Sequence, residues 1–317
     1  MDELCLVTGG AGFIGSHLVE ALTARGRRVR VFDDFSTGLR SNLDGFRPAP
    51  EVVTGDLADP DAVARAVAGA GVVYHLGALA SVARSVEAPA VSHRACATGT
   101  LHVLDAARQA GVRRVVYAAS SSAYGGASDP TGQSEDQPIQ PLSPYAAAKL
   151  SGELYCQAFA HTYGLETVRL RFFNIFGPRQ RADSPYSGVI ALFIAAMTAG
   201  KAPTVHGDGL QSRDFTYVGN AVQALIRAAE TPGVSGRVYN VGTGASITVL
   251  DLIAALNKLL GTRLEPQFGP TRAGDVRYSR ADIHKARAEL GYAPDVSFAE
   301  GLGRTLRWYQ SQAARAG

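Results

Sequence analysis

Gly9-Gly10-Ala11-Gly12-Phe13-Ile14-Gly15 is the stretch that decides the fold of this chain. The apolar run before it, residues 3–8, is typical of a buried parallel strand, and residues 16–22 after it carry a helical pattern. The glycines read as GxxGxxG from Gly9 and as GxGxxG from Gly10. Such glycines permit a tight turn, close approach of a pyrophosphate, and close packing of the helix on the strand. The stretch therefore predicts a dinucleotide-binding turn, with the anion at the helix N-terminus.

An aspartate ends the next strand-like run. Residues 28–32 are strand-like and lead into Asp33, which lies 18 residues beyond Gly15. A carboxylate at this position accepts hydrogen bonds from the adenosine ribose hydroxyls and repels a 2′-phosphate. No arginine follows it directly, since the next residues, 34–38, read Asp-Phe-Ser-Thr-Gly. The pattern favours NAD over NADP, although an exposed loop aspartate is the alternative.

A tyrosine and a lysine, Tyr145 and Lys149, stand four residues apart. On a helix this spacing puts both side chains on one face, one turn apart. A free tyrosine has a pKa of about 10, and bringing it to about 7 takes roughly 4 kcal/mol. One cation about 4 Å away supplies roughly that in a partly buried site. The pair can therefore act as a general acid and base near neutral pH. The alternative is a surface helix with an ordinary tyrosine and a solvated lysine, and the N-terminal turn favours the catalytic interpretation.

Composition excludes several classes of protein. At 317 residues, with 46% hydrophobic and 19% charged residues, the chain is an ordinary globular protein of one large or two medium domains. A net charge of +3 without a basic block does not indicate binding to nucleic acid or to a membrane surface. Cys5, Cys96 and Cys156 have no metal-ligand spacing, so we expect no metal and a reducing compartment. Residues 1–3 lack a basic signal region, and the longest apolar stretch, 188–200, is too short to span a bilayer. These features predict a cytoplasmic protein.

Strand-like runs alternate with helical segments along the first half of the chain. This alternation implies βαβ units and a doubly wound, Rossmann-type parallel sheet, an α/β fold with helices on both faces. Ligands of such sheets bind beyond the C-terminal ends of the strands, where residues 9–15, Asp33 and Ser120 fall. The alternating segments are 51–55, 60–68, 72–75, 89–110, 114–119, 144–163 and 166–171.

The pattern loosens after Asn174, where glycine and proline punctuate shorter elements. We predict an NAD-binding domain over residues 1–173, with segments near 214–243 returning to it. Residues 174–213 and 244–317 are predicted to form a smaller C-terminal α/β domain over the mouth of the sheet, where it binds the substrate.

These motifs together resemble the extended short-chain dehydrogenase/reductase superfamily, because residues 8–15, Asp33, Ser120, Tyr145 and Lys149 occur in its order and spacing. The resemblance covers essentially the whole chain. Three further motifs are similar to those of NAD-dependent nucleotide-sugar epimerases, in particular the 4-epimerases of UDP-glucose and UDP-N-acetylglucosamine. They are Arg171-Phe172-Phe173-Asn174-Ile175-Phe176-Gly177-Pro178, Ser212-Arg213-Asp214-Phe215 and Arg272-Ala273-Gly274-Asp275.

The resemblance implies a role for each catalytic residue. Tyr145 would remove the proton from the sugar 4-hydroxyl while C4 passes hydride to NAD⁺. Lys149 would bind the nicotinamide ribose and lower the pKa of Tyr145, helped by the positive nicotinamide. Ser120 would hydrogen-bond the reacting oxygen, with Ser121 as its competitor. The 4-keto sugar would then turn over and take the hydride on its other face, so that UDP-glucose and UDP-galactose interconvert without net NADH.

The resemblance also assigns the residues around the cofactor and the substrate. NAD would be held by Gly9, Gly12, Phe13, Ile14, Gly15, Asp33, Asp34, Ser36, Gly38, Asp56, Leu57, Leu76, Ala78, Ala80, Tyr145, Lys149 and Phe173. The UDP-sugar would be held by Ser81, Ser120, Ser121, Tyr145, Asn174, Val189, Arg213, Arg272, Asp275 and Ser279, with the arginines facing the pyrophosphate. A homodimer is implied through the helical segments 89–110 and 144–163.

Two positions bear on which reaction and which sugar are expected. Sugar 4,6-dehydratases of the superfamily carry an acidic residue soon after the catalytic Ser/Thr, and decarboxylating relatives usually place a glutamate there. Residues 121–124 contain no carboxylate, which favours a plain epimerase. Ser279 aligns with a position that gates the sugar pocket, where a small residue admits an N-acetyl group. We therefore expect both plain and N-acetylated hexoses as substrates, unless Ser279 is only an exposed loop serine or the alignment shifts by one residue.

One departure and two alternatives stay open. Cys96 stands where the family usually has an asparagine, so a network beside the cofactor must be rewired or bridged by water. A 4-epimerase of UDP-glucuronic acid or another nucleotide sugar would need a group for the C6 carboxylate, which the sequence does not identify. A non-catalytic NAD-sensing protein would be expected to lack Tyr145 or Lys149, and both are present.

Overall fold

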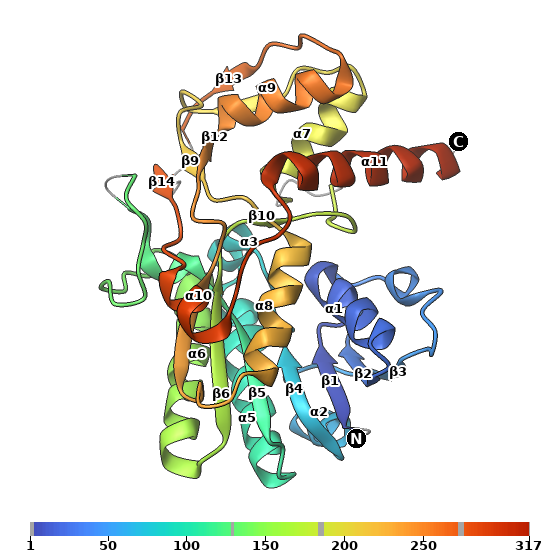
Figure 1. The fold of residues 1–317 in the computed structure, drawn as a ribbon, viewed down its shortest axis with the longest axis vertical. Helices are drawn as coiled ribbons and strands as arrows, with labels where there is room; N and C mark the ends of the chain where they lie inside the picture. The colour runs from blue at the N-terminus through green and yellow to red at the C-terminus, as the bar shows by residue number, and fades with distance from the viewer. Residues whose placement is uncertain (1–2, 128–129, 183–186, 272–275, 317) are drawn as a thin grey trace.

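The computed structural model describes residues 3–127, 130–182, 187–271 and 276–316. Seven strands form one sheet in the order β3-β2-β1-β4-β5-β6-β11, and every neighbouring pair is parallel (Figure 1). The central strands are almost wholly buried, as expected for apolar runs covered on both faces. The strands are β1 (Leu4–Thr8), β2 (Arg28–Asp33), β3 (Glu51–Thr54), β4 (Ala70–His75), β5 (Arg114–Ser120), β6 (Glu166–Phe172) and β11 (Arg237–Val241).

Helices cover both faces of this sheet (Figure 1). On one face, Leu18, Val19 and Leu22 of α1 pack in one core cluster with residues of α8. On the other face, α2, α5 and α6 bury a second cluster that contains Val63, Leu104 and Phe159. The predicted Rossmann-type sheet is therefore confirmed. The helices of these two layers are α1 (Phe13–Ala24), α8 (Val218–Glu230), α2 (Pro60–Val67), α5 (Gly99–Gln109) and α6 (Pro144–Tyr163).

The segment predicted as one helix over residues 89–110 is not regular along its length. It consists of α4 (Pro89–His93), a π-helical turn η2 (Arg94–Thr98) and α5, while α3 (Val82–Glu87) precedes it. A π turn inserts an extra residue into the helical hydrogen-bond ladder and is frequent at functional sites. Cys96 lies in this turn and is fully buried.

A smaller second core lies beyond the C-terminal ends of the large sheet (Figure 1). It is built mainly from α7, α9 and α11, which bury Ile194, Leu256 and Leu302 among others. Short strands complete this part in the pairings β12-β9-β14, β13-β8 and β10-β7. The elements are α7 (Val189–Thr198), α9 (Val249–Leu260), α11 (Phe298–Ala316), β7 (Ile175–Phe176), β8 (Thr204–His206), β9 (Ser212–Arg213), β10 (Thr216–Tyr217), β12 (Ile247–Thr248), β13 (Gln267–Gly269) and β14 (Tyr278–Ser279).

The chain crosses between the two parts more than once. The segment 218–241 supplies α8 and β11 to the layers of the large sheet. Helix α10 (His284–Leu290) packs against β11 and α8, although it falls in the range 244–317 that we assigned to the second domain. The predicted boundaries stay a prediction, and α10 belongs by its contacts to the large sheet. None of the helices in the described part of the chain is both long and apolar enough to cross a membrane.

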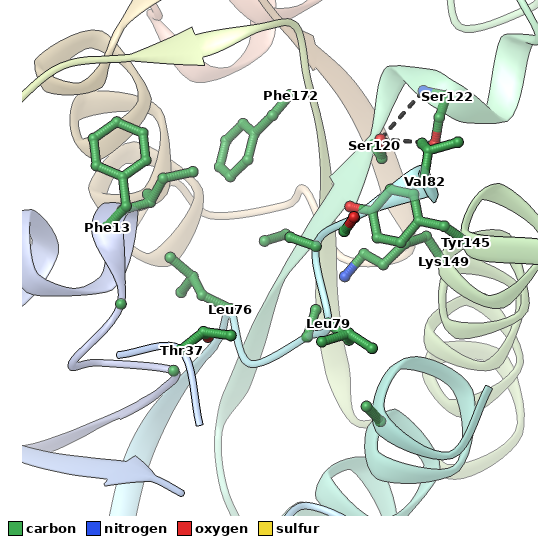
Figure 2. Close-up of a pocket in the computed structure, with 18 of the residues that line it drawn as sticks. Phe13, Thr37, Leu76, Leu79, Val82, Ser120, Ser122, Tyr145, Lys149 and Phe172 are labelled. Carbon is green, nitrogen blue, oxygen red and sulfur yellow. Dashed lines mark hydrogen bonds between the residues drawn. The ribbon is translucent and has the colours of Figure 1, made fainter. Parts of the chain in front are cut away.

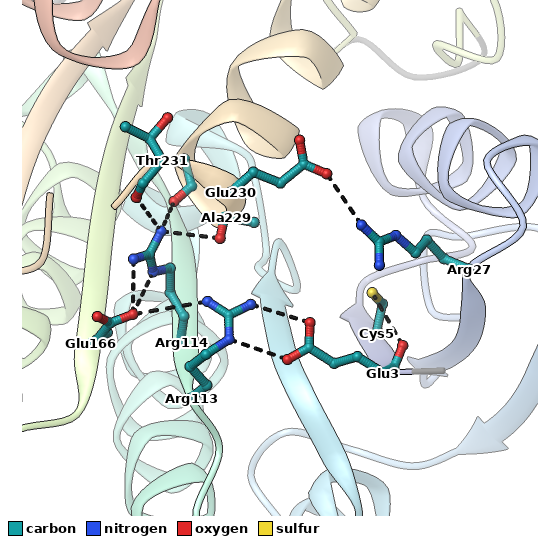
Figure 3. A network of polar contacts seen from close by, with 10 residues as sticks. Glu3, Cys5, Arg27, Arg113, Arg114, Glu166, Ala229, Glu230 and Thr231 are labelled. Atoms are coloured by element: carbon teal, nitrogen blue, oxygen red, sulfur yellow. Dashed lines mark hydrogen bonds and ion pairs between the residues drawn. The ribbon is translucent and has the colours of Figure 1, made fainter. Parts of the chain in front are cut away.

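A buried arginine joins β5, β6 and α8 at the end of the sheet opposite the glycine turn (Figure 3). Arg114, 3% exposed, donates from Nη1 to the carbonyls of Ala228, Ala229 and Thr231 at the end of α8, at 2.6 to 3.0 Å. Its Nε and Nη2 both lie 2.8 Å from Oε2 of Glu166. The guanidinium satisfies carbonyls that a helix end leaves without partners.

Candidate functional site

A cavity of about 1150 Å³ opens at the C-terminal ends of the central strands, where the chain order reverses between β1 and β4. Such switch points are the usual ligand sites of open parallel sheets. Residues from the second part of the molecule, including Asn174, Arg213 and Ser279, line the same cavity. Figure 2 shows its interior, with Phe13, Leu76 and Phe172 around one part of the space and Tyr145 and Lys149 around another.

The glycine turn forms a cradle that side chains would fill. Gly9 has a φ of +66°, and a Cβ on it would stand 2.8 Å from the Cα of Gly77. A Cβ on Gly15 would stand 2.1 Å from the carbonyl oxygen of Gly9. Helix α1 starts directly after Gly12, without a side-chain cap, so its first N–H groups remain for an anion. The geometry fits the pyrophosphate of a dinucleotide.

Asp33 is held at the edge of this cradle. Its Oδ2 accepts from the N–H of Ala11 and its Oδ1 from the N–H of Phe35, both at 2.9 Å. Burial raises the pKa of this carboxyl, while the two backbone hydrogen bonds lower it. Asp34 in turn accepts from the N–H and Oγ of Ser36, at 2.9 and 2.7 Å. The loop after β2 therefore presents a fixed carboxylate, as expected for ribose recognition.

Most residues predicted to hold the cofactor line the cavity, and two do not. Gly38 packs against Ala11 and Asp33, so that an added Cβ would stand 2.9 to 3.0 Å from them. Phe173 was expected in the site, but its ring is fully buried in the core, 6.1 Å from the ring of Tyr124. Phe172 lines the cavity instead, since successive side chains at the end of β6 point to opposite sides. The lining residues of the predicted set are Gly9, Gly12, Phe13, Ile14, Gly15, Asp33, Asp34, Ser36, Asp56, Leu57, Leu76, Ala78, Ala80, Tyr145 and Lys149.

The three predicted catalytic residues meet in this cavity (Figure 2). Ser120 ends β5, and its Oγ accepts from the N–H of Ser122 at 3.2 Å and from its hydroxyl at 2.8 Å. Tyr145 and Lys149 stand one turn apart on α6, which begins after the capping Ser143. Lys149 is 4% exposed and holds its Nζ 4.3 Å from the centre of the Tyr117 ring.

Burial affects the pKa values of both members of this pair. Burial raises the pKa of Tyr145 well above its usual value, and hydrogen bonding to Ser120 opposes this only in part. Burial likewise lowers the pKa of Lys149. The lowering of the Tyr145 pKa that the resemblance implies, by Lys149 helped by the positive nicotinamide, is opposed by this burial.

The predicted substrate residues within the described part of the chain lie in two places. Ser81, Ser120, Ser121, Tyr145, Asn174, Arg213 and Ser279 line the large cavity. Val189 lines an adjoining hollow of about 130 Å³, which Asn174 and Arg213 also border. Arg272 and Asp275 lie outside the described residues.

Ser279 is buried rather than an exposed loop residue. It is 7% exposed and ends β14, which pairs with β9. Asn174, at a φ of +38°, directs its Nδ2 to the Oγ of Ser279 and to the carbonyl of Asp214, at 3.4 Å each. The serine therefore belongs to the cavity wall that the second part of the molecule contributes.

Asp214 is a buried residue next to Arg213 to which the sequence analysis assigned no role. It is fully buried and accepts hydrogen bonds from the backbone N–H groups of Thr243, Gly244 and Ala281, at 2.8 to 3.2 Å. It thereby ties the strand that carries Arg213 to the segment after Ser279. Its position inside a quoted motif was the available signal, but only the neighbouring arginine was assigned a role.

Three residues of the loop 178–181, to which the sequence analysis assigned no ligand, also border the site. Arg179, Gln180 and Arg181 line the cavity. Nε2 of His17 lies 2.9 Å from the carbonyl of Pro178, and Arg179 pairs with Glu20 at 2.6 Å, so the loop is fastened to α1. The signal was its place directly after the motif that ends at Pro178.

Cys96, the departure from the family pattern, packs beside the catalytic helix. It forms a small buried cluster with Ala97 and Ala148, against which Tyr145 packs. Its Sγ lies 4.0 Å from the carbonyl oxygen of Leu79. The thiol thus has a weak backbone partner in the place of an asparagine amide.

The fold and the site define an NAD-binding enzyme of the extended short-chain dehydrogenase/reductase type. Residues 5–242 match the model of the NAD dependent epimerase/dehydratase family, and the chain belongs to that family. It is 39% identical to a UDP-glucose 4-epimerase of Mycolicibacterium smegmatis over 310 residues, 97% of this chain and 98% of that protein.

Solved structures agree with this placement. The UDP-glucose 4-epimerase of Thermotoga maritima, crystallised with UDP-glucose, superposes with a TM-score of 0.93 at 36% identity, over 98% of this chain and 99% of that one. The UDP-N-acetylglucosamine 4-epimerase of Methanobrevibacter ruminantium, in complex with UDP-N-acetylmuramic acid, gives a TM-score of 0.93 at 37% identity with the same coverage. The chain is therefore similar to UDP-glucose 4-epimerases.

Proposed function

We propose that this protein interconverts the C4 epimers of UDP-hexoses with bound NAD. One observation carries the proposal: the wall of the cavity at Ser120–Ser122 places hydroxyls beside Tyr145 and Lys149 without a carboxylate. Among the described residues that line the cavity, the carboxylates are Asp33, Asp34 and Asp56, which lie at the end of β2 and in the loops after β2 and β3. A 4,6-dehydratase would need an acid near the reacting sugar, so the geometry favours epimerisation.

Tyr145 is proposed as the group that takes and returns the proton of the sugar 4-hydroxyl. Its phenol is buried and neutral on its own, because burial raises its pKa. Lys149 is held on the same face of α6 and supplies one positive charge near the phenolate. Ser120 donates to the reacting oxygen and orients it toward Tyr145.

Bound NAD would supply the acceptor and donor of hydride at C4. The chain's part in holding it falls to the cradle of Gly9, Gly12 and Gly15, the carboxylate of Asp33, and Lys149. Epimerisation further requires that the sugar turn over while its nucleotide stays fixed. Arg213 and Asn174 at one end of the cavity are proposed to hold the diphosphate, so that the hexose remains the loosely held part.

Substrate breadth is proposed to depend on Ser279. A small buried residue in this wall leaves room that a tyrosine side chain would fill, so N-acetylated sugars are expected beside plain hexoses. The relative that binds UDP-N-acetylmuramic acid is consistent with a roomy sugar site. In a Ser279→Tyr variant, turnover of UDP-N-acetylgalactosamine is expected to be lost while turnover of UDP-galactose persists. Equal loss of both would contradict the gate.

A homodimer through α4 and α6 is also proposed. Val91 on α4, which also borders the cavity, is 46% exposed, and Leu154 and Tyr155 on α6 are 56% and 42% exposed. Helices α4 and α6 pack together, and exposed apolar side chains on packed helices are typical of an interface between subunits. Gel filtration with light scattering would test this, and a monomer stable on dilution would exclude it.

The decisive experiment is a product assay on the purified protein. UDP-galactose, UDP-N-acetylgalactosamine and UDP-glucuronic acid are incubated separately with enzyme and NAD, and products are identified by proton NMR. C4 epimers without accumulated NADH would establish the proposal, and the Tyr145→Phe variant serves as the control. A 4-keto-6-deoxy sugar would identify a dehydratase, and conversion of none of the three would refute the sugar assignment.

A further inference from the structure

A buried chain of hydrogen bonds connects the glycine turn to the π turn. The N–H of Gly77 donates to Oγ1 of Thr8 at 3.1 Å, and this Oγ1 lies 2.7 Å from Nδ1 of His75. Nε2 of His75 lies 2.9 Å from Oγ1 of Thr100, whose hydroxyl donates to the carbonyl of Cys96. The side chains of Thr8, His75 and Thr100 are at most 1% exposed.

The partners determine where each proton lies. The carbonyl of Cys96 can only accept, so Thr100 spends its one hydrogen on it and must accept from His75. Nε2 of His75 is therefore the protonated nitrogen, and Nδ1 accepts the hydroxyl hydrogen of Thr8. The hydroxyl of Thr8 in turn accepts from the N–H of Gly77. The side chains of Thr8, His75 and Thr100 therefore each accept one hydrogen bond and donate one, all in the same direction, and every polar atom of this hydrogen-bond chain has a partner.

The two ends of this hydrogen-bond chain contact the two parts of the proposed reaction centre, the glycine turn and helix α6. Gly77 lines the cavity and packs closely on Gly9. A Cβ added to Gly9 would stand 2.8 Å from the Cα of Gly77. Cys96, at the other end, packs beside Ala148 and Tyr145 on α6. The hydrogen-bond chain thus extends from the glycine turn to helix α6, which carries Tyr145.

A second contact joins the same imidazole to the catalytic lysine. The centre of the Tyr117 ring lies 5.6 Å from the centre of the His75 ring and 4.3 Å from Nζ of Lys149. The hydroxyl of Tyr117 also donates to the backbone carbonyl of Lys149 at 3.0 Å. Burial, with the charge of Lys149, lowers the pKa of His75 to about 3. The imidazole is therefore neutral at working pH and acts by its position.

We propose that His75 is a positioning residue that sets the dinucleotide turn relative to the π turn beside Tyr145. The nitrogen Nδ1 fixes the cofactor side through Thr8, and the nitrogen Nε2 fixes the catalytic side through Thr100. This inference rests on the proposed function for its effect on turnover, while its effect on NAD binding needs only the family's cofactor.

Three variants separate the two nitrogens. His75→Asn keeps an acceptor near the place of Nδ1 and loses the donor to Thr100. His75→Gln keeps a donor near the place of Nε2 and loses the acceptor for Thr8. His75→Leu keeps neither. Misplacement by about 1 Å costs on the order of 100-fold in rate, so smaller shifts of the reacting groups are expected to cost about tenfold.

The experiment measures NAD affinity and, separately, kcat per NAD-loaded site with UDP-galactose. The His75→Asn variant is expected to keep NAD affinity and to lose about tenfold in kcat, whereas His75→Gln should weaken NAD binding and keep kcat within about threefold. His75→Leu should lose both. Equal effects of Asn and Gln on both quantities, or unchanged values in the Leu variant, would overturn the proposal.

Threonine variants provide a matched control that does not depend on replacing the imidazole. Thr100→Val interrupts the hydrogen-bond chain because it removes the hydroxyl, whereas Thr100→Ser retains it. Only the valine variant should therefore lower kcat. Thr167→Val removes a similar hydrogen bond, which a fully buried threonine donates to the carbonyl of Cys156, and which is not part of the hydrogen-bond chain through His75. If Thr167→Val lowers kcat per loaded site as much as Thr100→Val, the effect is general loosening and the inference fails. If the wild-type protein converts no UDP-sugar, the proposed function fails, and the His75 variants are then judged by NAD affinity alone.

Discussion

Replacing Arg114 with methionine tests how the last strands of the sheet are joined. The shorter side chain keeps an unbranched apolar stem but loses the charged donors to Glu166 and to the three carbonyls that end α8 (Figure 3). Arg113, its neighbour, offers a matched control, because it also approaches Glu166 but is 48% exposed. The two variants remove the same chemical group from adjacent positions that differ in burial.

The expected magnitude follows from the contacts. The three carbonyls share one nitrogen, Nη1 of Arg114, so they amount to about two full hydrogen bonds from a charged donor, roughly 3–6 kcal/mol. Burial of the methionine side chain returns about 1.5 kcal/mol. Glu166 is 38% exposed and keeps Arg113, so its loss adds little. We expect Arg114→Met to lower the free energy of unfolding by about 3 kcal/mol.

Urea unfolding followed by far-ultraviolet circular dichroism measures this free energy. The single tryptophan, Trp308, lies on α11 in the other part of the molecule and would report on the wrong region. Arg113→Met, which loses the exposed pairs with Glu3 and Glu166, is expected to cost about 0–1 kcal/mol. If both variants lose the same stability, or if Arg114→Met costs less than about 1 kcal/mol, the reasoning from burial is refuted.

Three further predictions concern the cofactor, the chemistry and acid stability. Tyr145→Phe should retain NAD and lower epimerisation by about 10²–10⁴-fold in the product assay; activity near wild type would remove its role. Gly15→Ala, whose Cβ would stand 2.1 Å from the Gly9 carbonyl, should lose bound NAD, whereas Gly303→Ala, with its nearest contact at 3.6 Å, should not. His75 has its pKa lowered from 6.5 to about 3, so it stabilises the fold fully above pH 6.5 and less as pH falls toward 3. Urea unfolding between pH 7.5 and 4.5 should therefore show a decline in stability that His75→Gln reduces, and an unchanged slope would contradict it.

Local signals explain why much of the fold could be predicted from the sequence. The predicted helix 144–163 has the observed bounds of α6, because Ser143 caps it, Pro144 occupies its first turn and Gly164 ends it at a φ of +70°. The glycine turn and Asp33 could be placed because each stands at the end of a strand whose apolar residues are buried. Each of these features is encoded within a few neighbouring residues.

The features that could not be predicted depend on contacts between distant parts of the chain. The choice between Phe172 and Phe173 needs the register of β6 in the sheet, which the motif alone does not contain. The π turn within residues 89–110 packs against α6, and the raised pKa of Tyr145 comes from burial in the folded protein. The link between Thr8, His75 and Thr100 joins three segments that become neighbours only in the folded sheet.

The position of β11 at the edge of the sheet has a consequence for synthesis on the ribosome. Strand β6 pairs with β5 on one side and waits on the other for β11, which emerges only after residues 173–236 have been made. During that interval β6 presents a row of free backbone groups to other chains. Vacant strand edges of this kind promote aggregation of nascent protein, so slow translation of residues 173–236, or truncation before residue 237, should yield insoluble material.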